Sequence, residues 1–435
     1  MRAIVFLLAC ILCFASQVGR AAANGNLSAI TYNTFLSTDE GRSARLPILL
    51  DLFRNGSVSS MADVVCLQEV QSIEHQGNVT AAARDGGYPY SFSFLDQFDT
   101  ATLAVLGSTP ACNAVNFARL GPCFGSASLC QSVLNSTDER VILNCLFSKC
   151  PGLLRAASLS QECINCFSIE AIRGIIGPGN KLGEGTCFTL PKLNFRSTYG
   201  LLLLSKYPLR NTATRTFLPT PSFFSRGYLR ATVAGGDDVG DWTALCTHLY
   251  PNVTGVMYGG PFMNEEEENL NNTLQMIGDS QVEDSDRVLW MGDMNHGPTL
   301  TGEAPTFPKN YQTVLESSYC SPFGELVRQC TFCGLRPARS ILDGIYVKAS
   351  FLTCADGVQA GNTASGVKLN ASVVLANEYV YSPLGPLQIS DHRGVRVTIS
   401  NIPRSTGEGS GSGRTAMLST WVTLAILAAV LHQLC

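Results

Sequence analysis

Short apolar runs alternate with helix-like and turn-like segments along most of this chain. Residues 27–34 alternate between apolar and polar side chains and are rich in β-forming residue types, which predicts a strand. A helix-like segment at 42–53 follows, and the apolar run at 63–67 predicts a second strand. The chain is therefore predicted to open with a β-α-β unit.

Strand patterns return from residue 199 onward, where period-2 or continuous apolar runs are bounded by turn residues. These runs read YGLLLLSKYPL (199–209), YLRATVA (228–234), WTALCTHL (242–249), RVLWMGDMN (287–295), SILDGIYVK (340–348) and RGVRVTIS (393–400). No internal repeat is visible. The alternation of strands with helix-like segments predicts an α/β fold.

One helix start is marked by an acidic run. Asn264 is predicted to cap a helix whose first turn holds Glu265 to Glu268, where acids complement the positive end of the helix dipole. Adjacent acids on a helix point in different directions, so we expect a solvated helix start there rather than a metal site.

Both ends of the chain resemble targeting signals. Arg2 precedes an apolar run at 3–15 and a small-residue cleavage site, so residues 1–23 predict a secretory signal peptide. Residues 404–435 predict a linker and a C-terminal lipid-anchor signal of the GPI type, because the apolar tail at 417–431 is shorter than the ~20 residues that span a membrane. A membrane-spanning tail helix and a purely soluble form are the alternatives. We expect the protein at the extracellular face of the plasma membrane or secreted.

Composition agrees with a large folded and exported domain. The chain has 435 residues, of which 45% are hydrophobic and 15% charged, which leaves no case for bulk disorder. The formal net charge of −4 is unlike the strongly basic balance of a dedicated nucleic-acid binder. N-x-S/T sequons, whose density fits a glycoprotein, occur at Asn26, Asn55, Asn78, Asn135, Asn252, Asn271 and Asn370.

Cysteine usage indicates disulfide bonds in an oxidising compartment. Of the 17 Cys, three lie in the terminal signals, and Cys66 and Cys246 lie inside apolar strand-like runs, where we expect buried free thiols. The rest fall between residues 112 and 187 and between 320 and 354. The C-x-x-C pairs at 163/166 and 330/333 lack companion zinc ligands at finger spacing, so we expect bridges, of undetermined connectivity.

Polar side chains with catalytic or metal-binding chemistry accompany the apolar strands, and we expect them at the C-terminal ends of those strands. Open α/β sheets place their ligand sites at such ends. Any one of these residues alone is a weak signal, because most single Asp or Asn residues after strands are turn or cap residues. The set is Asn33, Glu69, His248, Asp293, Asn295, Asp343, Asp391 and His392.

The motifs LQEV (67–70), THL (247–249), MGDMNHGP (291–298) and SDHRGV (390–395), in this order, resemble the endonuclease/exonuclease/phosphatase superfamily. The resemblance covers nearly all of a predicted catalytic domain at 24–403, apart from a Cys-rich insertion at 112–187. It implies a four-layer sandwich of two packed mixed β-sheets flanked by helices. The insertion, with amphipathic pieces such as residues 132–150, is predicted to be a disulfide-rich helical addition. The resemblance also implies hydrolysis of a phosphoester with Mg²⁺.

The same residues fit magnesium chemistry. Mg²⁺ prefers hard oxygen ligands and takes one or two carboxylates, so Glu69 is the natural ligand, with Asn33 beside it. Asp391 is predicted to support the metal or to orient His392. Mn²⁺ and Ca²⁺ are the alternative cations.

Roles in an in-line attack follow from residue type. His392 is predicted to act as the base on the water side, paired with Asp343, because a carboxylate partner fixes the tautomer of an imidazole and raises its basicity. His248 is then the donor on the opposite side. Asp293 and Asn295, two residues apart on one extended segment, are predicted to face the same way and to hold water and a phosphoryl oxygen.

Three functions remain open at this stage. A phosphodiesterase acting on a phospholipid such as sphingomyelin is favoured by the anchor signal, the acidic balance and the form of YGLLLLSKYPL, which looks like the sphingomyelinase and phosphatase branch. A secreted nuclease needs a basic groove, for which Arg196, Lys206, Arg210, Arg215, Arg226 and Arg230 are candidates. The segment RSTYG (196–200) lacks the Glu of the deoxyribonuclease I branch, which disfavours the nuclease. An inactive adhesion-type ectodomain is the third function, and the sequence gives no basis for naming a protein partner.

Overall fold

A computed structural model gives the fold. It describes residues 25–36, 42–113, 160, 162–163, 165–166, 186–189, 191–192, 200–218, 226–252, 262–282, 286–301, 306–333, 339–352, 354, 366–376, 379–382, 385–388 and 390–403. The predicted signal peptide and lipid-anchor signal, the segment 132–150 and residues 196–199 lie outside these ranges. Among the described residues, no helix is both long enough and apolar enough to cross a membrane.

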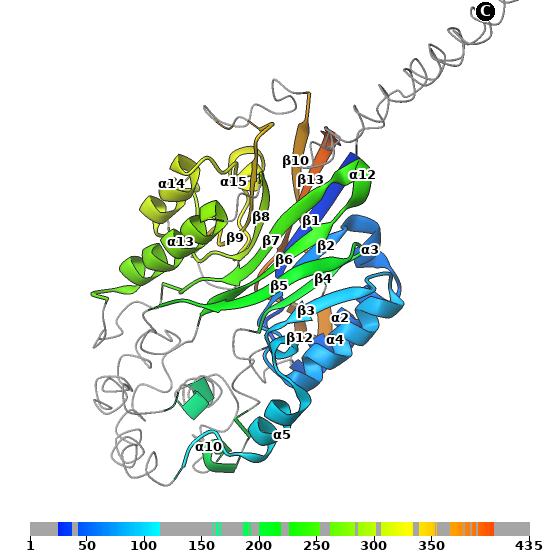
Figure 1. The fold of residues 1–435 in the computed structure, drawn as a ribbon, viewed down its shortest axis with the longest axis vertical. Helices are drawn as coiled ribbons and strands as arrows, with labels where there is room; N and C mark the ends of the chain where they lie inside the picture. The colour runs from blue at the N-terminus through cyan, green and yellow to red at the C-terminus, as the bar shows by residue number, and fades with distance from the viewer. Residues whose placement is uncertain are drawn as a thin grey trace, which may run out of the picture.

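Two mixed β-sheets form the centre of the molecule (Figure 1). The six-stranded sheet has the order β10 (Lys368–Val374), β13 (Gly394–Ile402), β1 (Gly25–Asn33), β2 (Val64–Gln68), β4 (Leu202–Ser205) and β3 (Tyr90–Ser93). The five-stranded sheet has the order β5 (Leu209–Thr216), β6 (Gly227–Ala234), β7 (Asp241–His248), β8 (Arg287–Asp293) and β9 (Asp343–Ala349). A separate hairpin pairs β11 (Tyr379–Ser382) with β12 (Gly385–Gln388).

Helices cover the outer face of each sheet. On the six-stranded sheet these are α2 (Arg42–Arg54), α3 (Ser57–Met61) and α4 (Ile73–Asp85), whose apolar side chains pack with those of β1 and β2. On the five-stranded sheet α13 (Glu265–Val282) and α14 (Pro308–Glu316) pack against β7, β8 and β9. The shorter helices are η1 (Phe94–Gln97), α5 (Thr100–Ser108), α10 (Thr186–Thr189), α12 (Gly236–Val239) and α15 (Pro322–Leu326). The predicted four-layer sandwich is confirmed.

A third apolar cluster fills the space between the two sheets, with alternate residues from β1 and β2 facing those of β7 and β8. Cys66 of β2 and Cys246 of β7 are bonded to each other across this core. The prediction of two buried free thiols is therefore wrong. Each residue lies in its own apolar strand, and only the packing of the sheets shows that the two inward-facing side chains meet.

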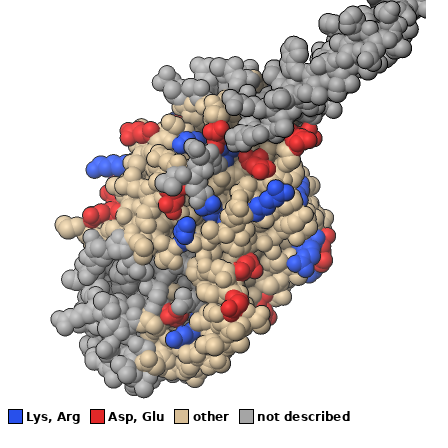
Figure 2. Space-filling view, in the orientation of Figure 1, with Lys and Arg blue, Asp and Glu red and all other residues tan. Residues whose placement is uncertain are grey.

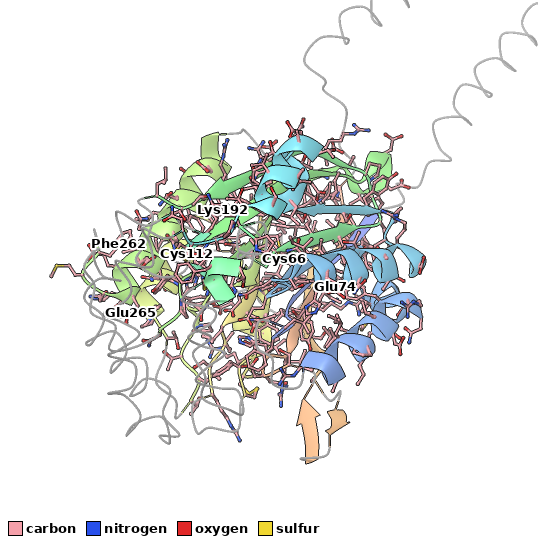
Figure 3. The ribbon with its side chains drawn as sticks, turned by 90° about the horizontal axis from the view of Figure 1, so that it is seen from below. Cys66, Glu74, Cys112, Lys192, Phe262 and Glu265 are labelled. Carbon is pink, nitrogen blue, oxygen red and sulfur yellow. A yellow bond between two sulfur atoms is a disulfide. The ribbon has the colours of Figure 1, made fainter. Side chains whose placement is uncertain are left out.

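The other described disulfides are Cys112–Cys163, Cys166–Cys187, Cys320–Cys354 and Cys330–Cys333. The two C-x-x-C motifs differ, because Cys163 and Cys166 each bond a distant partner whereas Cys330 and Cys333 bond each other. The ends of the insertion run side by side, with the Cys112 amide donating to the Cys187 carbonyl and the Lys192 amide to Thr109 (Figure 3 labels Cys112 and Lys192).

The start of α13 differs from the prediction in one respect. Asn264 caps the helix, since its side-chain oxygen accepts a hydrogen bond from the Glu267 amide at 2.9 Å. However, Glu265 and Glu268 are buried rather than solvated. Glu268 interacts electrostatically with the buried Arg226 at the start of β6, which compensates its charge. A run of acids in sequence cannot show that a distant arginine lies against the helix.

Candidate active site

The parallel pairing of β1 and β2 brings Asn33 and Glu69 to one edge of the six-stranded sheet. The Asn33 amide nitrogen donates to Glu69 Oε1 at 3.1 Å. Glu69 has a left-handed backbone, with φ of 62°, and Gly200 lies directly against it. A Cβ on Gly200 would meet Glu69 Cα at 2.8 Å, so only glycine fits beneath the Glu69 backbone.

In the five-stranded sheet, the parallel pairing of β7 and β8 brings His248 and Asp293 together at the strand ends, where they are register partners. Asp293 Oδ2 lies 3.3 Å from His248 Nε2 and accepts a hydrogen bond from the Asn33 amide nitrogen at 3.0 Å. This last bond joins the ends of strands from both sheets. Asp293 is therefore the point at which the two sheets share a site.

Asp343, Asp391 and His392 reach this edge differently from the prediction. Asp343 is the first residue of β9, and Asp391 and His392 precede β13, so all three lie at strand beginnings rather than at C-terminal ends. Because β9 runs antiparallel to β8, and β13 antiparallel to β1, their beginnings lie at the edge where β8 and β1 end.

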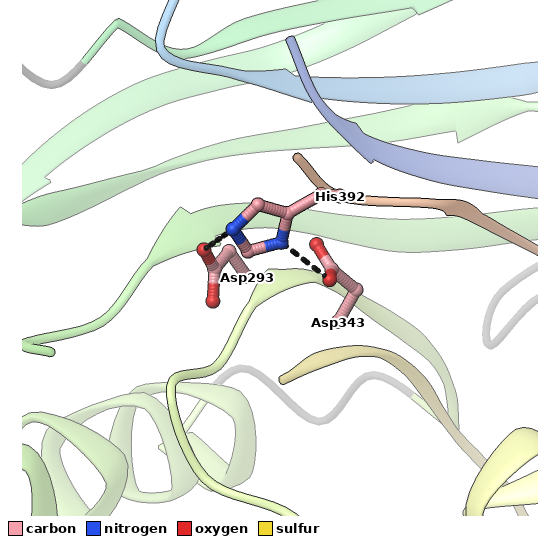
Figure 4. A group of neighbouring side chains, drawn as sticks. All are labelled: Asp293, Asp343 and His392. Atoms are coloured by element: carbon pink, nitrogen blue, oxygen red, sulfur yellow. Dashed lines mark hydrogen bonds and ion pairs between the residues drawn. The ribbon is translucent and has the colours of Figure 1, made fainter. Parts of the chain in front are cut away.

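His392 lies between two carboxylates (Figure 4). Its Nδ1 is 2.7 Å from Asp343 Oδ2, and its Nε2 is 3.7 Å from Asp293 Oδ2. The Ser390 hydroxyl donates to the Asn33 carbonyl at 2.6 Å and accepts from the His392 amide at 3.0 Å, which fixes the backbone before the imidazole. The predicted pairing of His392 with Asp343 is present in the structure.

The prediction that Asp293 and Asn295 lie on one extended segment is wrong. The strand β8 ends at Asp293, and Asn295 has a left-handed φ of 49°. The Asn295 amide N–H donates to Asp293 Oδ1, and its side chain donates to the Leu249 carbonyl, both at 3.0 Å. In this structure Asn295 orients Asp293, and its predicted contact with a phosphoryl oxygen stays a prediction.

Burial and charge perturb the titration of these groups. Burial raises the pKa of Asp293 to about 7, although the nearby His392 counteracts it. Burial is the main cause that holds the pKa of His248 well below 6.5, and the positive charge of Arg226 adds to it. Burial also opposes the charged form of His392, but the charges of Asp343, Asp293 and Asp391 together raise its pKa well above 6.5. The surroundings therefore favour the neutral form of His248 and the charged form of His392.

Comparison with known families identifies the fold. The model of the Endonuclease/Exonuclease/phosphatase family matches residues 30–392, which make up most of the chain and include every site residue named above. The chain belongs to the endonuclease/exonuclease/phosphatase family. Members of this family hydrolyse phosphoric esters.

Solved structures with this fold share little sequence with the chain. Sphingomyelinase C from Streptomyces griseocarneus is 15% identical over 86% of this chain and 99% of that chain, at a TM-score of 0.44. Beta toxin from Staphylococcus aureus, with bound magnesium ions, is 13% identical over 86% of this chain and 99% of that chain, at 0.44. TDP2 from D. rerio, complexed with a single-strand DNA product, is 13% identical over the same shares, at 0.43. No curated protein sequence matches the chain.

The family fold implies a divalent metal, and the residues at the site fit one. Burial and the charge of Glu69 raise the pKa of Asp391 to about 6 despite His392, so the two carboxylates repel each other. Asp293, Asp343 and His392 also have ligand atoms close together. Both ring nitrogens of His392 face carboxylates, however, with Nδ1 hydrogen-bonded to Asp343 and Nε2 in an ion-pair contact with Asp293, so the ring is held between carboxylates rather than turned toward a metal. The assignment of Glu69 and Asp391 as metal ligands stays a prediction.

Asn33 presents its amide nitrogen to Glu69, so in this structure it positions that carboxylate. Its predicted role as a ligand stays a prediction.

Arg226 is a site residue that the sequence analysis placed only in a surface cluster. The Arg226 side chain is buried. Burial lowers the pKa of its guanidinium, and the negative charges of Glu69 and Asp293 partly offset this effect. Nothing in its local sequence distinguishes it from the other bases near β6.

Proposed function

We propose that this protein is a Mg²⁺-dependent phosphodiesterase that acts on a phospholipid such as sphingomyelin at the outer membrane surface. The observation that carries the proposal is the convergence on Asp293 of Asn33, His248 and His392 from both sheets. Buried carboxylates and imidazoles with displaced pKa values, joined at one sheet edge, are the groups that phosphoester hydrolysis needs.

The cation would be held by Glu69 and Asp391, with Asn33 orienting Glu69. Mg²⁺ supplies positive charge that neutralises the phosphoryl oxygens, and Mn²⁺ or Ca²⁺ are alternatives with the same oxygen preference. Both carboxylates are only partly buried, and the repulsion of Glu69, which helps to raise the pKa of Asp391, supports the assignment because a shared cation would offset it.

Side chains of this protein would donate and accept the protons of the reaction. His392, held by Asp343, keeps a proton next to Asp293, and it can donate that proton or stabilise a phosphoryl oxygen. Asp293, with a pKa raised to about 7, can accept a proton from an attacking water near neutral pH. His248 is neutral and presents a ring N–H toward the same side. The sequence placed the base on His392, whereas the charges around the site favour Asp293 for that role.

A nuclease is the second candidate, and the placement of the basic residues gives it less support. Lys206 follows β4 and is paired with Asp63, which precedes β2, so it lies at the edge opposite the site. Arg210 begins β5 at that same edge, whereas Arg215 and Arg226 lie near the site end. The face in Figure 2 shows basic and acidic side chains interspersed rather than one basic band. These four described bases are therefore split between two ends of the sheets.

Export and anchoring belong to the same proposal. The terminal signals of the sequence support a protein held by a GPI anchor, or secreted, on the extracellular side. Asn26, Asn55, Asn78, Asn252 and Asn370 are exposed sequon residues, which agrees with glycosylation. Asn252 lies four residues after His248, so a glycan there would crowd the site, and we propose that it stays unmodified.

A substrate panel tests the function. The full-length protein is assayed with sphingomyelin vesicles, plasmid DNA and an inositol polyphosphate, each with Mg²⁺ and with EDTA, beside His392→Ala. We expect release of the phosphorylated headgroup from the vesicles, lost with EDTA and with the variant. DNA cleavage that weakens steeply with salt would instead establish the nuclease. No hydrolysis of any substrate by a folded wild-type protein would overturn the proposal.

A further inference from the structure

A four-residue segment closed by the Cys330–Cys333 disulfide lies beside the catalytic pair of Asp343 and His392. Thr331 inside this segment is fully buried, and Phe332 is half-buried. Of the described C-x-x-C motifs, this is the one whose two sulfurs bond each other. The sequence analysis identified it only as a bridge, and the proposed chemistry assigns no role to it.

The backbone of this segment joins the two sheets at the site edge. The Thr331 and Phe332 amides donate to the Ser340 carbonyl, at 3.0 and 3.1 Å, and the Ser340 amide donates back to Phe332. Ser340 leads into β9 of the five-stranded sheet. On its other side, the Arg393 amide donates to the Thr331 carbonyl at 2.8 Å, directly before β13 of the six-stranded sheet. Asp343 and His392 come from these two strands, so one short segment contacts the backbone beside both.

The side chains of the segment act on the same two residues. Thr331 Oγ1 accepts hydrogen bonds from the amides of Leu342 and Asp343, at 2.9 and 3.0 Å, and so fixes the backbone that carries the Asp343 carboxylate. The ring of Phe332 packs against the imidazole of His392, with centroids 5.1 Å apart. Each catalytic side chain therefore has one partner within the closed segment.

We propose that Thr331 and Phe332, held in place by the Cys330–Cys333 disulfide, are positioning residues that set the distance between Asp343 and His392. The two residues belong to different sheets, so small shifts of one sheet on the other would change this distance unless a segment bound both. The expected loss of kcat rests on the proposed function, whereas the expected change in the contact between Asp343 and His392 does not. Misplacement of a catalytic group by about 1 Å can cost about 100-fold in rate.

Two substitutions of Thr331 separate positioning from packing. Thr331→Val keeps the shape and removes the hydroxyl, whereas Thr331→Ser keeps the hydroxyl and removes a methyl group. For headgroup release from sphingomyelin vesicles, we expect kcat to fall about 10- to 100-fold in the Val variant, with KM nearly unchanged, and to return within about threefold of wild type in the Ser variant. Equal kcat values in wild type and a folded Val variant would overturn the proposal, as would equal losses in both variants.

The disulfide is tested by Cys330→Ser/Cys333→Ser, with Cys320→Ser/Cys354→Ser as the matched control at another bridge. We expect the first double variant to lower kcat by about tenfold or more, and the control to lower thermal stability without lowering kcat at 25 °C. A first double variant that is folded and as active as wild type contradicts the proposal. If Thr331→Val does not fold, this comparison and Phe332→Leu, for which a lower kcat at unchanged KM is expected, decide the question.

A readout that needs no turnover distinguishes failure of this inference from failure of the proposed function. The chain has five His, so the proton that His392 Nδ1 shares with Asp343 can be assigned by ¹H–¹⁵N NMR with His392→Gln as reference. We expect this signal to shift or broaden in Thr331→Val and in the Cys330/Cys333 variant, and to be retained in Thr331→Ser. An unchanged signal in both disrupting variants would overturn the positioning role, whatever substrate the protein cleaves.

Discussion

At the scale of single residues, the site depends on a buried carboxylate that is surrounded by nitrogen donors. Asp293 accepts hydrogen bonds from the Asn33 side chain and the Asn295 amide and faces two imidazoles. A buried carboxylate without such partners would be neutral or would destabilise the fold. The donors leave it able to ionise close to neutral pH, which is the property that proton transfer requires.

Gly200 provides a test of how closely the site is built. Gly200→Ala places a Cβ 2.8 Å from Glu69 Cα, at a φ of 57°, and we expect displacement of Glu69 to lower kcat/KM about 100-fold and to raise the Mg²⁺ concentration needed. Gly366→Ala is the matched control, because Gly366 has a φ of 76° but open space around its Cβ position. Similar activity losses in both variants would show that backbone strain, rather than contact with Glu69, is responsible.

Burial of His296, in the MGDMNHGP motif, should make the free energy of unfolding depend on pH. Burial lowers its pKa to about 3, while the unfolded chain takes up a proton near 6.5. The neutral folded form is therefore fully favoured above pH 6.5, and this contribution is lost as the pH falls from 6.5 toward 3, by up to about 1.4 kcal/mol per unit. Urea unfolding at pH 7 and pH 5 should show a smaller loss of stability for His296→Gln than for wild type. Equal losses would mean that other groups dominate acid unfolding.

At the scale of elements, α13 is tied to the strand ends by one polar side chain. Asn269 is buried on α13, and its amide nitrogen donates to the Tyr250 and Met294 carbonyls, after β7 and β8. Its oxygen contacts His296 Nδ1 and the Asn310 amide, each at 2.9 Å. This network holds the helix layer against the loops that carry the site.

We expect Asn269→Ala to reduce the free energy of unfolding by about 3 kcal/mol or more, because it leaves several buried polar groups without partners. Asn264→Ala, at the cap of the same helix, should cost only about 1 kcal/mol, since its capping bond is exposed. Chemical denaturation of both variants measures the difference. A cost at position 269 no larger than at position 264 would contradict the described network.

The predicted strands and the order of site residues agree with the structure because their signals are local. A buried run followed by a polar residue is visible for Asn33, Glu69, His248 and Asp293 without knowledge of the neighbours. Sequence could not show that Asp343 and His392 begin their strands, because the site edge is set by antiparallel pairing with distant partners. The burial of Glu268 and the contact of Gly200 with Glu69 are likewise invisible until the layers are packed.

At the scale of the whole molecule, the two sheets are joined both by the site and by a covalent bond through the core. Cys66 and Cys246 are 180 residues apart, and their disulfide closes a loop that contains much of the chain. The sequence suggested two free thiols because each lies in an apolar strand, and pairing across sheets leaves no trace in the spacing of cysteines.

Cys66→Ala/Cys246→Ala is expected to lower the free energy of unfolding by about 2 to 5 kcal/mol, because a long loop is released in the unfolded chain. Activity at 25 °C should be largely retained in the folded fraction, since both cysteines lie in the apolar core between the sheets. Thermal unfolding without reductant measures the change. An unaltered stability would show that the core alone holds the sheets together.

Hydrolysis of a simple phosphodiester by Asp293→Asn tests the central claim most directly. The substitution keeps the shape and removes the charge between the two imidazoles. With bis(p-nitrophenyl) phosphate and Mg²⁺, we predict a loss of kcat of about 10²- to 10⁴-fold relative to wild type. Asp51→Asn, at an exposed position on α2, should keep full activity. Wild-type rates in Asp293→Asn, or wild-type hydrolysis that persists in EDTA, would contradict the account.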